Sequence, residues 1–335
     1  MTIDLPLIWA GIIAFAVFMY VLMDGFDLGV GILFPFVRDE GERDIMMNSV
    51  APVWDGNETW LVLGGGGLMV AFPLAYATIL PALYLPVLLM LIALIFRGVA
   101  FEFRFKAEGR QKHAWSWSFH LGSVFAAFAQ GVILGSFIQG FTVEGRDFVG
   151  GPLDWLTPFA ILTGFGLIAG YALLGTTWLV MKTEGGLQAW AYRNAERALL
   201  AVLGFIAIVS VWTPFMDPDI AARWFAWPNI AVLSPVPIVT GLVALGLFVA
   251  LRRRFEGYPF IGAIALFGLS YLGIAISLWP NVVPPDISIW DAASAPKTQA
   301  FMLFGVVAVT PFVLAYTAFS YWVFRGKVRG DTGYH

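Results

Sequence analysis

Long apolar stretches dominate the chain and alternate with short polar ones. A membrane-spanning helix needs about 20 mostly apolar residues, because the hydrocarbon core is roughly 30 Å thick and a helix rises about 1.5 Å per residue. The pattern predicts an all-α polytopic membrane protein with nine transmembrane helices, at 6–35, 50–73, 76–98, 117–141, 157–181, 198–215, 228–250, 259–280 and 299–324. No long polar linker divides the chain, so we expect one membrane domain over 1–335, with helical halves at about 1–141 and 157–324.

The basic residues indicate which side of the membrane each loop faces. Sixteen of the 19 Lys and Arg residues lie around the loops after the first, third, fifth and seventh stretches or in the C-terminal tail. The other loops hold only Arg146, Arg223 and Lys297. Because short cytoplasmic loops collect Lys and Arg, we expect the N-terminus outside and the C-terminus in the cytoplasm.

Composition agrees with burial in lipid and limits the chemistry of the chain. Charged residues make up 12% of it, against about 25% in a soluble domain. The absence of Cys excludes disulfides, thiolate zinc sites and iron–sulfur clusters. Of the three histidines, His113 lies in a basic loop and His335 is the last residue, whereas His120 is either a haem ligand or a hydrogen-bonded structural residue. We expect no metal in this chain.

Two carboxylates stand inside the first apolar stretch. Asp24 and Asp27 are three residues apart, so they share one face of a helix. An acid at the bilayer centre costs about 2.5 to 3.5 kcal/mol on insertion scales, and such residues are functional candidates by default. Counted from Arg38, the pair is expected roughly 15 to 20 Å deep. The pair therefore favours a route for protons leading inward from the cytoplasm.

The second apolar stretch repeats this spacing with Asp55 and Glu58. These acids either extend a chain of protonatable groups or are structural. In the structural interpretation Pro52 occupies the first turn of the helix, whose dipole favours nearby negative charge, and the acids pair with a cation such as Arg97. Arg97 lies closest to the hydrocarbon in the basic segment 96–106, so it is the arginine expected to pair with a buried carboxylate. The rest of that segment is interpreted as a topology signal at the membrane surface.

The glycines carry a packing signal. Gly25 and Gly29 are four residues apart and predict a close approach between helices, because small residues let backbones meet in lipid. Four consecutive glycines, 64–67, are expected to interrupt the second helix. A close ligand such as a quinone or a macrocycle is the alternative explanation for these small residues.

Six segments together resemble subunit II of the cytochrome bd family of bacterial quinol oxidases, and look closest to its cyanide-insensitive branch. They are MDGFDLGVG (23–31), NSVAPVWDGNETWL (48–61), FRGVAFEFRFK (96–106), GYALLGTTWLVMKTEG (170–185), PPDISIWDA (284–292) and VLAYTAFSYWVFRGKV (313–328). They span almost the whole chain in the family's order.

The resemblance implies a heterodimer with subunit I in the bacterial inner membrane, each subunit having two four-helix bundles plus one peripheral helix. Subunit I is then expected to carry the b-type haems, the d-type haem and the quinol site, where quinol reduces oxygen to water with protons from the cytoplasm. The resemblance also implies a proton path through the carboxylates at Asp24, Asp27 and Asp55 and, less directly, Glu58. Trp54, Asn57 and Arg97 are expected to be supporting residues. A small accessory subunit, membrane lipids and quinone are further partners of the family, and nothing indicates nucleic acid.

Two other functions remain open from the residues. A proton-coupled secondary transporter can place its substrate site at the Gly and Asp positions of the first two stretches. A purely structural membrane subunit is the third possibility, and it predicts that Asp27→Asn and Asp55→Asn leave turnover intact. Purification with a haem-bearing partner separates the oxidase subunit from the transporter.

Overall fold

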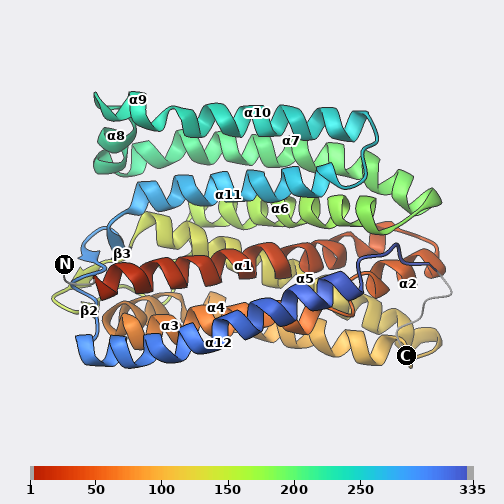
Figure 1. Ribbon diagram of the computed structural model, residues 1–335, viewed down its shortest axis with the longest axis horizontal. Helices are drawn as coiled ribbons and strands as arrows, with labels where there is room; N and C mark the ends of the chain where they lie inside the picture. The colour runs from red at the N-terminus through yellow and green to blue at the C-terminus, as the bar shows by residue number, and fades with distance from the viewer. Residues whose placement is uncertain (1–3, 330–335) are drawn as a thin grey trace.

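The structure, a computed structural model, describes residues 4–329 and is built almost entirely of long helices that run along one axis (Figure 1). The first half contains α1 (Leu5–Leu33), the 3-10 turn η1 (Phe34–Phe36), α2 (Glu40–Asn48), α3 (Trp54–Ala71), α4 (Pro73–Arg104) and α5 (Gly109–Gln139). The second half contains α6 (Pro158–Lys182), α7 (Gly185–Met216), α8 (Pro218–Phe225), α9 (Asn229–Leu233), α10 (Pro235–Arg252), α11 (Tyr258–Leu278) and α12 (Pro296–Val323).

Two small antiparallel hairpins interrupt the helices. The first pairs β1 (Val143–Glu144) with β2 (Asp147–Phe148), and the second pairs β3 (Asn281–Val283) with β4 (Ile287–Ser288). Both lie at the end of the molecule where α1 begins (Figure 1). The hairpins therefore connect helices at one end of the bundle and leave its middle wholly helical.

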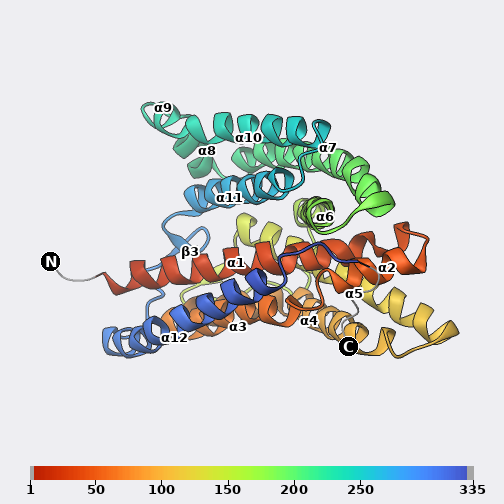
Figure 2. The same cartoon turned by 45° about the vertical axis from the view of Figure 1, so that its right-hand side comes forward.

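The helices form neighbouring groups that meet along α1, α5 and α6. α1, α3, α4 and α5 lie together, with α12 against α1 and α3, while α7, α10 and α11 lie beyond α6 (Figure 2). The largest apolar core is built from these meeting helices, and it includes Phe26, Leu28, Phe119, Leu173 and Trp178. α1 is thus held on several sides at the level of its two acids.

Eight helices in the described part of the chain are long and apolar enough to cross a membrane. They correspond to eight of the nine stretches predicted from the sequence. The remaining stretch, 50–73, folds as α3, which does not meet the same measure because its first turns carry Asp55, Asn57 and Glu58. The structure therefore confirms a polytopic all-α membrane protein.

Several helix boundaries and breaks differ from the predictions. α5 and α7 begin at Gly109 and Gly185, well before the predicted 117 and 198, because hydropathy marks the lipid-crossing part of a helix and not its charged extension.

The four glycines do not interrupt α3, which is continuous through them. Pro52 precedes α3 and does not occupy its first turn. A kink lies instead in α4 at Leu83, between Pro81 and Pro86, since a proline inside a helix removes an amide donor and clashes with the preceding turn.

The expected packing role of Gly25 and Gly29 is confirmed at the contact between α1 and α6. A Cβ atom added to Gly29 would lie 1.9 Å from the carbonyl oxygen of Tyr171, and one added to Gly175 would lie 2.4 Å from the carbonyl carbon of Gly29. At Gly25 an added Cβ would lie 2.7 Å from the Tyr171 ring. The two backbones therefore touch, which only glycine permits.

Replacing Gly29 with Ala is expected to destabilise the protein by about 1 to 3 kcal/mol, because the methyl group must push two backbones apart. Thermal unfolding of the purified protein in detergent measures the effect. The matched control is Gly65→Ala in α3, where an added Cβ meets only open space. Equal unfolding temperatures for the two variants would contradict the backbone contact.

Candidate functional site

The centre of the candidate site is a buried arginine of α4 that faces three carboxylates. Arg97 has no exposed surface, and its Nη1 lies 2.5 Å from Asp24 Oδ1 and 3.0 Å from Glu58 Oε1. Its Nη2 lies 3.8 Å from Asp27 Oδ2. The structure confirms the expected pairing of Arg97 with a buried carboxylate, and it shows that one guanidinium holds α1, α3 and α4 together.

The two acids of α1 reach the same arginine because of their spacing. Three residues along a helix bring side chains to one face, and both Asp24 and Asp27 are almost wholly buried, with 1% and 0% of their surface exposed. Glu58 differs, since 28% of its side chain is exposed. Glu58 is therefore the member of the cluster that is open to the surface of the isolated chain.

Asn57 and Tyr321 extend the cluster toward α12. The Asn57 amide nitrogen donates to Asp27 Oδ2 at 2.7 Å and to the carbonyl oxygen of Met23 at 3.2 Å. The Tyr321 hydroxyl donates to Asn57 Oδ1 at 2.9 Å. This arrangement fixes the orientation of the amide, so that its NH₂ group faces the carboxylate.

Aromatic rings cover the other side of the arginine. Trp54 stacks on Phe101 with ring centroids 4.9 Å apart, and the Arg97 guanidinium carbon lies 5.8 Å from each ring. Gly98 leaves room for the indole, because a Cβ there would lie 3.3 Å from it. Trp54 thus shields the ion cluster and gains a cation–π contact with Arg97.

A second set of buried, hydrogen-bonded side chains lies beside Asp24. Gln130 donates to the Tyr20 hydroxyl at 2.7 Å and accepts from the Tyr171 hydroxyl at 2.6 Å. Tyr20 precedes Asp24 by one helical turn and therefore lies on its face of α1. Sequence reasoning missed these three residues and Tyr321. Their only signal was a hydrogen-bonding side chain within an apolar stretch.

The chain matches a known protein family. The family model described as cytochrome bd terminal oxidase subunit II matches residues 5–324. The chain belongs to that family. It is 29% identical to the cytochrome bd-I ubiquinol oxidase subunit 2 of Escherichia coli, over 98% of this chain and 96% of the relative. It is 30% identical to the cytochrome bd ubiquinol oxidase subunit 2 of Bacillus subtilis, over 96% of each.

A solved structure supports the fold. The bd oxidase of Geobacillus thermodenitrificans contains a chain that matches this one with a TM-score of 0.75 at 17% identity, over 96% of this chain and 99% of that one. Membership of the family makes this subunit II chain a multi-pass protein of the bacterial inner membrane and a component of a quinol oxidase complex. The predicted resemblance to this family is confirmed.

The structure does not bring every predicted site residue into the cluster. Asp55 is exposed in the first turn of α3, whereas Glu58, three residues later, reaches Arg97. Only one acid of α3 therefore reaches Arg97, whereas both acids of the pair in α1 do. Being in the first helical turn, Asp55 occupies a position where the helix dipole favours a negative charge.

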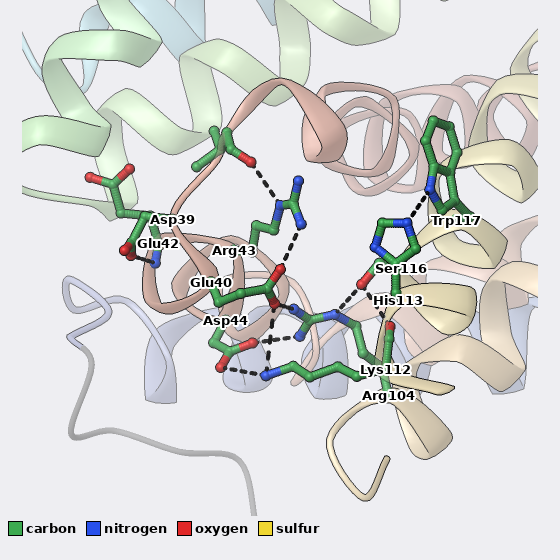
Figure 3. A network of polar contacts seen from close by, with 11 residues as sticks. Asp39, Glu40, Glu42, Arg43, Asp44, Arg104, Lys112, His113, Ser116 and Trp117 are labelled. Carbon is green, nitrogen blue, oxygen red and sulfur yellow. Dashed lines mark hydrogen bonds and ion pairs between the residues drawn. The ribbon is translucent and has the colours of Figure 1, made fainter. Parts of the chain in front are cut away.

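A second ionic network lies at the basic end of subunit II and corrects one expectation about segment 96–106. Arg104, which was expected at the membrane surface, is wholly buried, and it contacts Asp44 at 2.5 Å, Glu40 at 3.0 Å and Ser116 at 3.0 Å (Figure 3). Lys112 contacts Asp44 at 3.3 Å. The network fastens the short helix α2 to α4 and α5.

The histidines give no sign of a metal site in the described part of subunit II. The Nδ1 atom of half-buried His120 lies 3.1 Å from the carbonyl oxygen of Gly31, as expected for the structural alternative. His113 hydrogen-bonds with Trp117, and His335 falls outside the described residues. No group of three or more His, Asp or Glu residues within 4–329 is arranged to hold a metal ion.

Proposed function

We propose that this chain is the subunit of a quinol:oxygen oxidoreductase that supports the haem-bearing subunit I and carries cytoplasmic protons toward it. The observation that carries the proposal is the buried cluster around Arg97. One guanidinium can balance one carboxylate, and Asp24, Asp27 and Glu58 all face it. The remaining carboxylates can bind and release protons at a depth where charged groups are otherwise costly.

The proposed route begins at the exposed acid and ends at the buried ones. Asp55 takes up protons at the surface of α3 and lies one helical turn from Glu58, which is partly exposed and touches Arg97. Arg97 in turn touches Asp24 and Asp27. Asp24 Oδ2 and Asp27 Oδ1 are buried without a hydrogen-bond partner among residues 4–329. Water is the natural partner for such atoms and the medium for proton transfer between them.

The topology that we propose has nine membrane crossings, made by the eight long apolar helices and by α3. An odd number is supported by the positions of α1, which begins at one end of the bundle, and α12, which finishes at the other (Figure 1). It also agrees with the gathering of basic residues on alternate loops. The N-terminus is then outside and the C-terminus is cytoplasmic.

The redox chemistry is assigned to the partner. In the proposed heterodimer subunit I holds haem b and haem d and oxidises quinol, and these groups supply the electrons and the site for oxygen reduction. The residues of this chain contribute a rigid bundle and the acids that hold and pass protons. His120 is already engaged with the backbone of Gly31, which fits a chain without a haem ligand.

Affinity purification of the tagged chain from its native membrane tests the proposal. We expect it to purify together with a haem-bearing subunit, and the preparation to show a reduced-minus-oxidised haem spectrum and quinol-driven oxygen consumption. A chain that purifies as a stable homogeneous protein without haem, and that functions in vesicles without a partner, would support the transporter instead.

A further inference from the structure

A cavity of about 140 Å³ lies at the end of the bundle that is proposed to face the cytoplasm. Its walls come from the turn before α3, the end of α6 and the end of α12, and they include Ser49, Met181 and Tyr321. A volume of this size exceeds what a single water molecule needs, and the polar residues Ser49, Lys182 and Tyr321 contribute to its mostly apolar wall. The cavity therefore has room for a small group of water molecules.

Two hydrogen bonds connect the wall of this cavity to the buried acid of α1. Tyr321, which lines the cavity, donates to Asn57, and Asn57 donates to Asp27. Asp27 is wholly buried, and its second oxygen has no protein partner among residues 4–329. One amide side chain thus stands between the cavity and an acid that has an unused acceptor.

We propose that this cavity is a cytoplasmic water inlet of the proton route, from which protons reach Asp27. The inference rests on the proposed function and specifies where water reaches that site. An amide holds its protons and does not pass them on, so the proton moves through water beside Asn57 and ends on a carboxylate oxygen of Asp27. The hydrogen bond from Tyr321 keeps the amide of Asn57 oriented toward Asp27.

The positively charged side chains in the cavity wall allow water but disfavour metal cations. Lys182 donates to the carbonyl oxygens of Phe324 and Gly326, and Arg325 donates to that of Trp322. Their positive charge disfavours the binding of metal cations in the cavity. The backbone amide of Val328 also donates to the carbonyl oxygen of Lys182 at 2.8 Å, which ties the tail after α12 to α6 and fixes the cavity wall.

Thiol labelling of the assembled oxidase tests the inlet, and the absence of Cys from this chain makes an introduced thiol unique within it. Met181→Cys places the thiol on the cavity wall, and Lys106→Cys, at a residue with 80% of its side chain exposed, is the matched control. Inside-out vesicles are treated with a negatively charged methanethiosulfonate. We expect M181C to be labelled and quinol-driven oxygen consumption to fall by about threefold or more, because the bulky group displaces several waters. Labelled K106C and equally treated wild type should keep their rates.

Charge selectivity gives a second readout that a merely structural cavity would not produce. The anionic reagent should label M181C faster than its cationic analogue, whereas K106C should show a smaller preference. Should M181C fail to assemble, Val53→Cys offers a thiol on another wall of the same cavity.

An unlabelled thiol, or a labelled one with an unchanged rate of oxygen consumption, overturns the inlet. If Asp27→Asn is nevertheless inactive, the proton path itself stands. An active Asp27→Asn enzyme would instead refute the proposed function.

Discussion

Replacing Asp27 with Asn is expected to lower quinol-driven oxygen consumption by about 100-fold while the complex still assembles. Asn has nearly the same shape as Asp, and its amide oxygen can still accept the hydrogen bond from Asn57. It cannot bind and release a proton. Arg97 keeps Asp24 and Glu58 as counter-charges, so no unpaired buried cation results. Oxygen consumption per haem in the purified complex measures the effect.

Two further carboxylate variants serve as comparisons for the oxygen-consumption rate of Asp27→Asn. Asp55→Asn is expected to slow turnover more than it weakens assembly, but by less than Asp27→Asn, because Asp55 is exposed and bulk water can partly replace it. Asp147→Asn, in the exposed first hairpin, should leave the rate unchanged. Wild-type turnover in assembled Asp27→Asn enzyme would show that the acids are structural. Loss of the whole complex would identify an assembly defect, and turnover per assembled haem separates the two cases.

Replacing Arg97 with Gln should prevent stable assembly. The guanidinium is wholly buried and is the cation that Asp24, Asp27 and Glu58 share. Removing one partner of a buried ion pair typically costs about 3 to 5 kcal/mol, because an uncompensated charge remains in a medium of low dielectric constant. That is a large part of the roughly 5 to 15 kcal/mol that holds a protein folded. The yield of haem-containing complex and its unfolding temperature measure the loss.

A paired variant separates charge from packing in the Arg97 prediction. Combining Arg97→Gln with Asp24→Asn removes the closest buried anion together with the cation, so the double variant should recover about 2 kcal/mol of the loss. Arg104→Gln provides a comparison at another buried arginine, whose partners Glu40 and Asp44 are partly exposed. If the double variant is no more stable than Arg97→Gln alone, the buried charge is not the cause of the instability.

The predictions from spacing succeeded where one helix was enough to determine the answer. Asp24 and Asp27 were expected on one face of α1, and both now face Arg97. The same reasoning applied to Asp55 and Glu58 brought only Glu58 to the cluster. The period of 3.6 residues predicts which residues share a helix face. How α3 packs against α1 and α4 determines which of those residues reach the cluster.

Other parts of the site depend on contacts between residues far apart in the chain. Tyr321 meets Asn57 across 264 positions, and Gln130 meets Tyr20 across 110. No local pattern relates such pairs, because side-chain partners in a helical bundle are set by how the helices cross. The burial of Arg104 was missed for the same reason, since its acids come from α2.

The amino-acid sequence by itself determined that this chain crosses a membrane repeatedly, that its family is the cytochrome bd subunit II family, and that acids of the first two apolar stretches deserve testing. Hydropathy, charge placement and short motifs are local properties, and they are written directly in the order of residues. Tertiary structure alone decided that one arginine collects three carboxylates, that Asp55 stays outside, and that a cavity ends two hydrogen bonds from Asp27. The physical reason is that buried charges must find their partners in space, and packing of whole helices determines which partners are within reach.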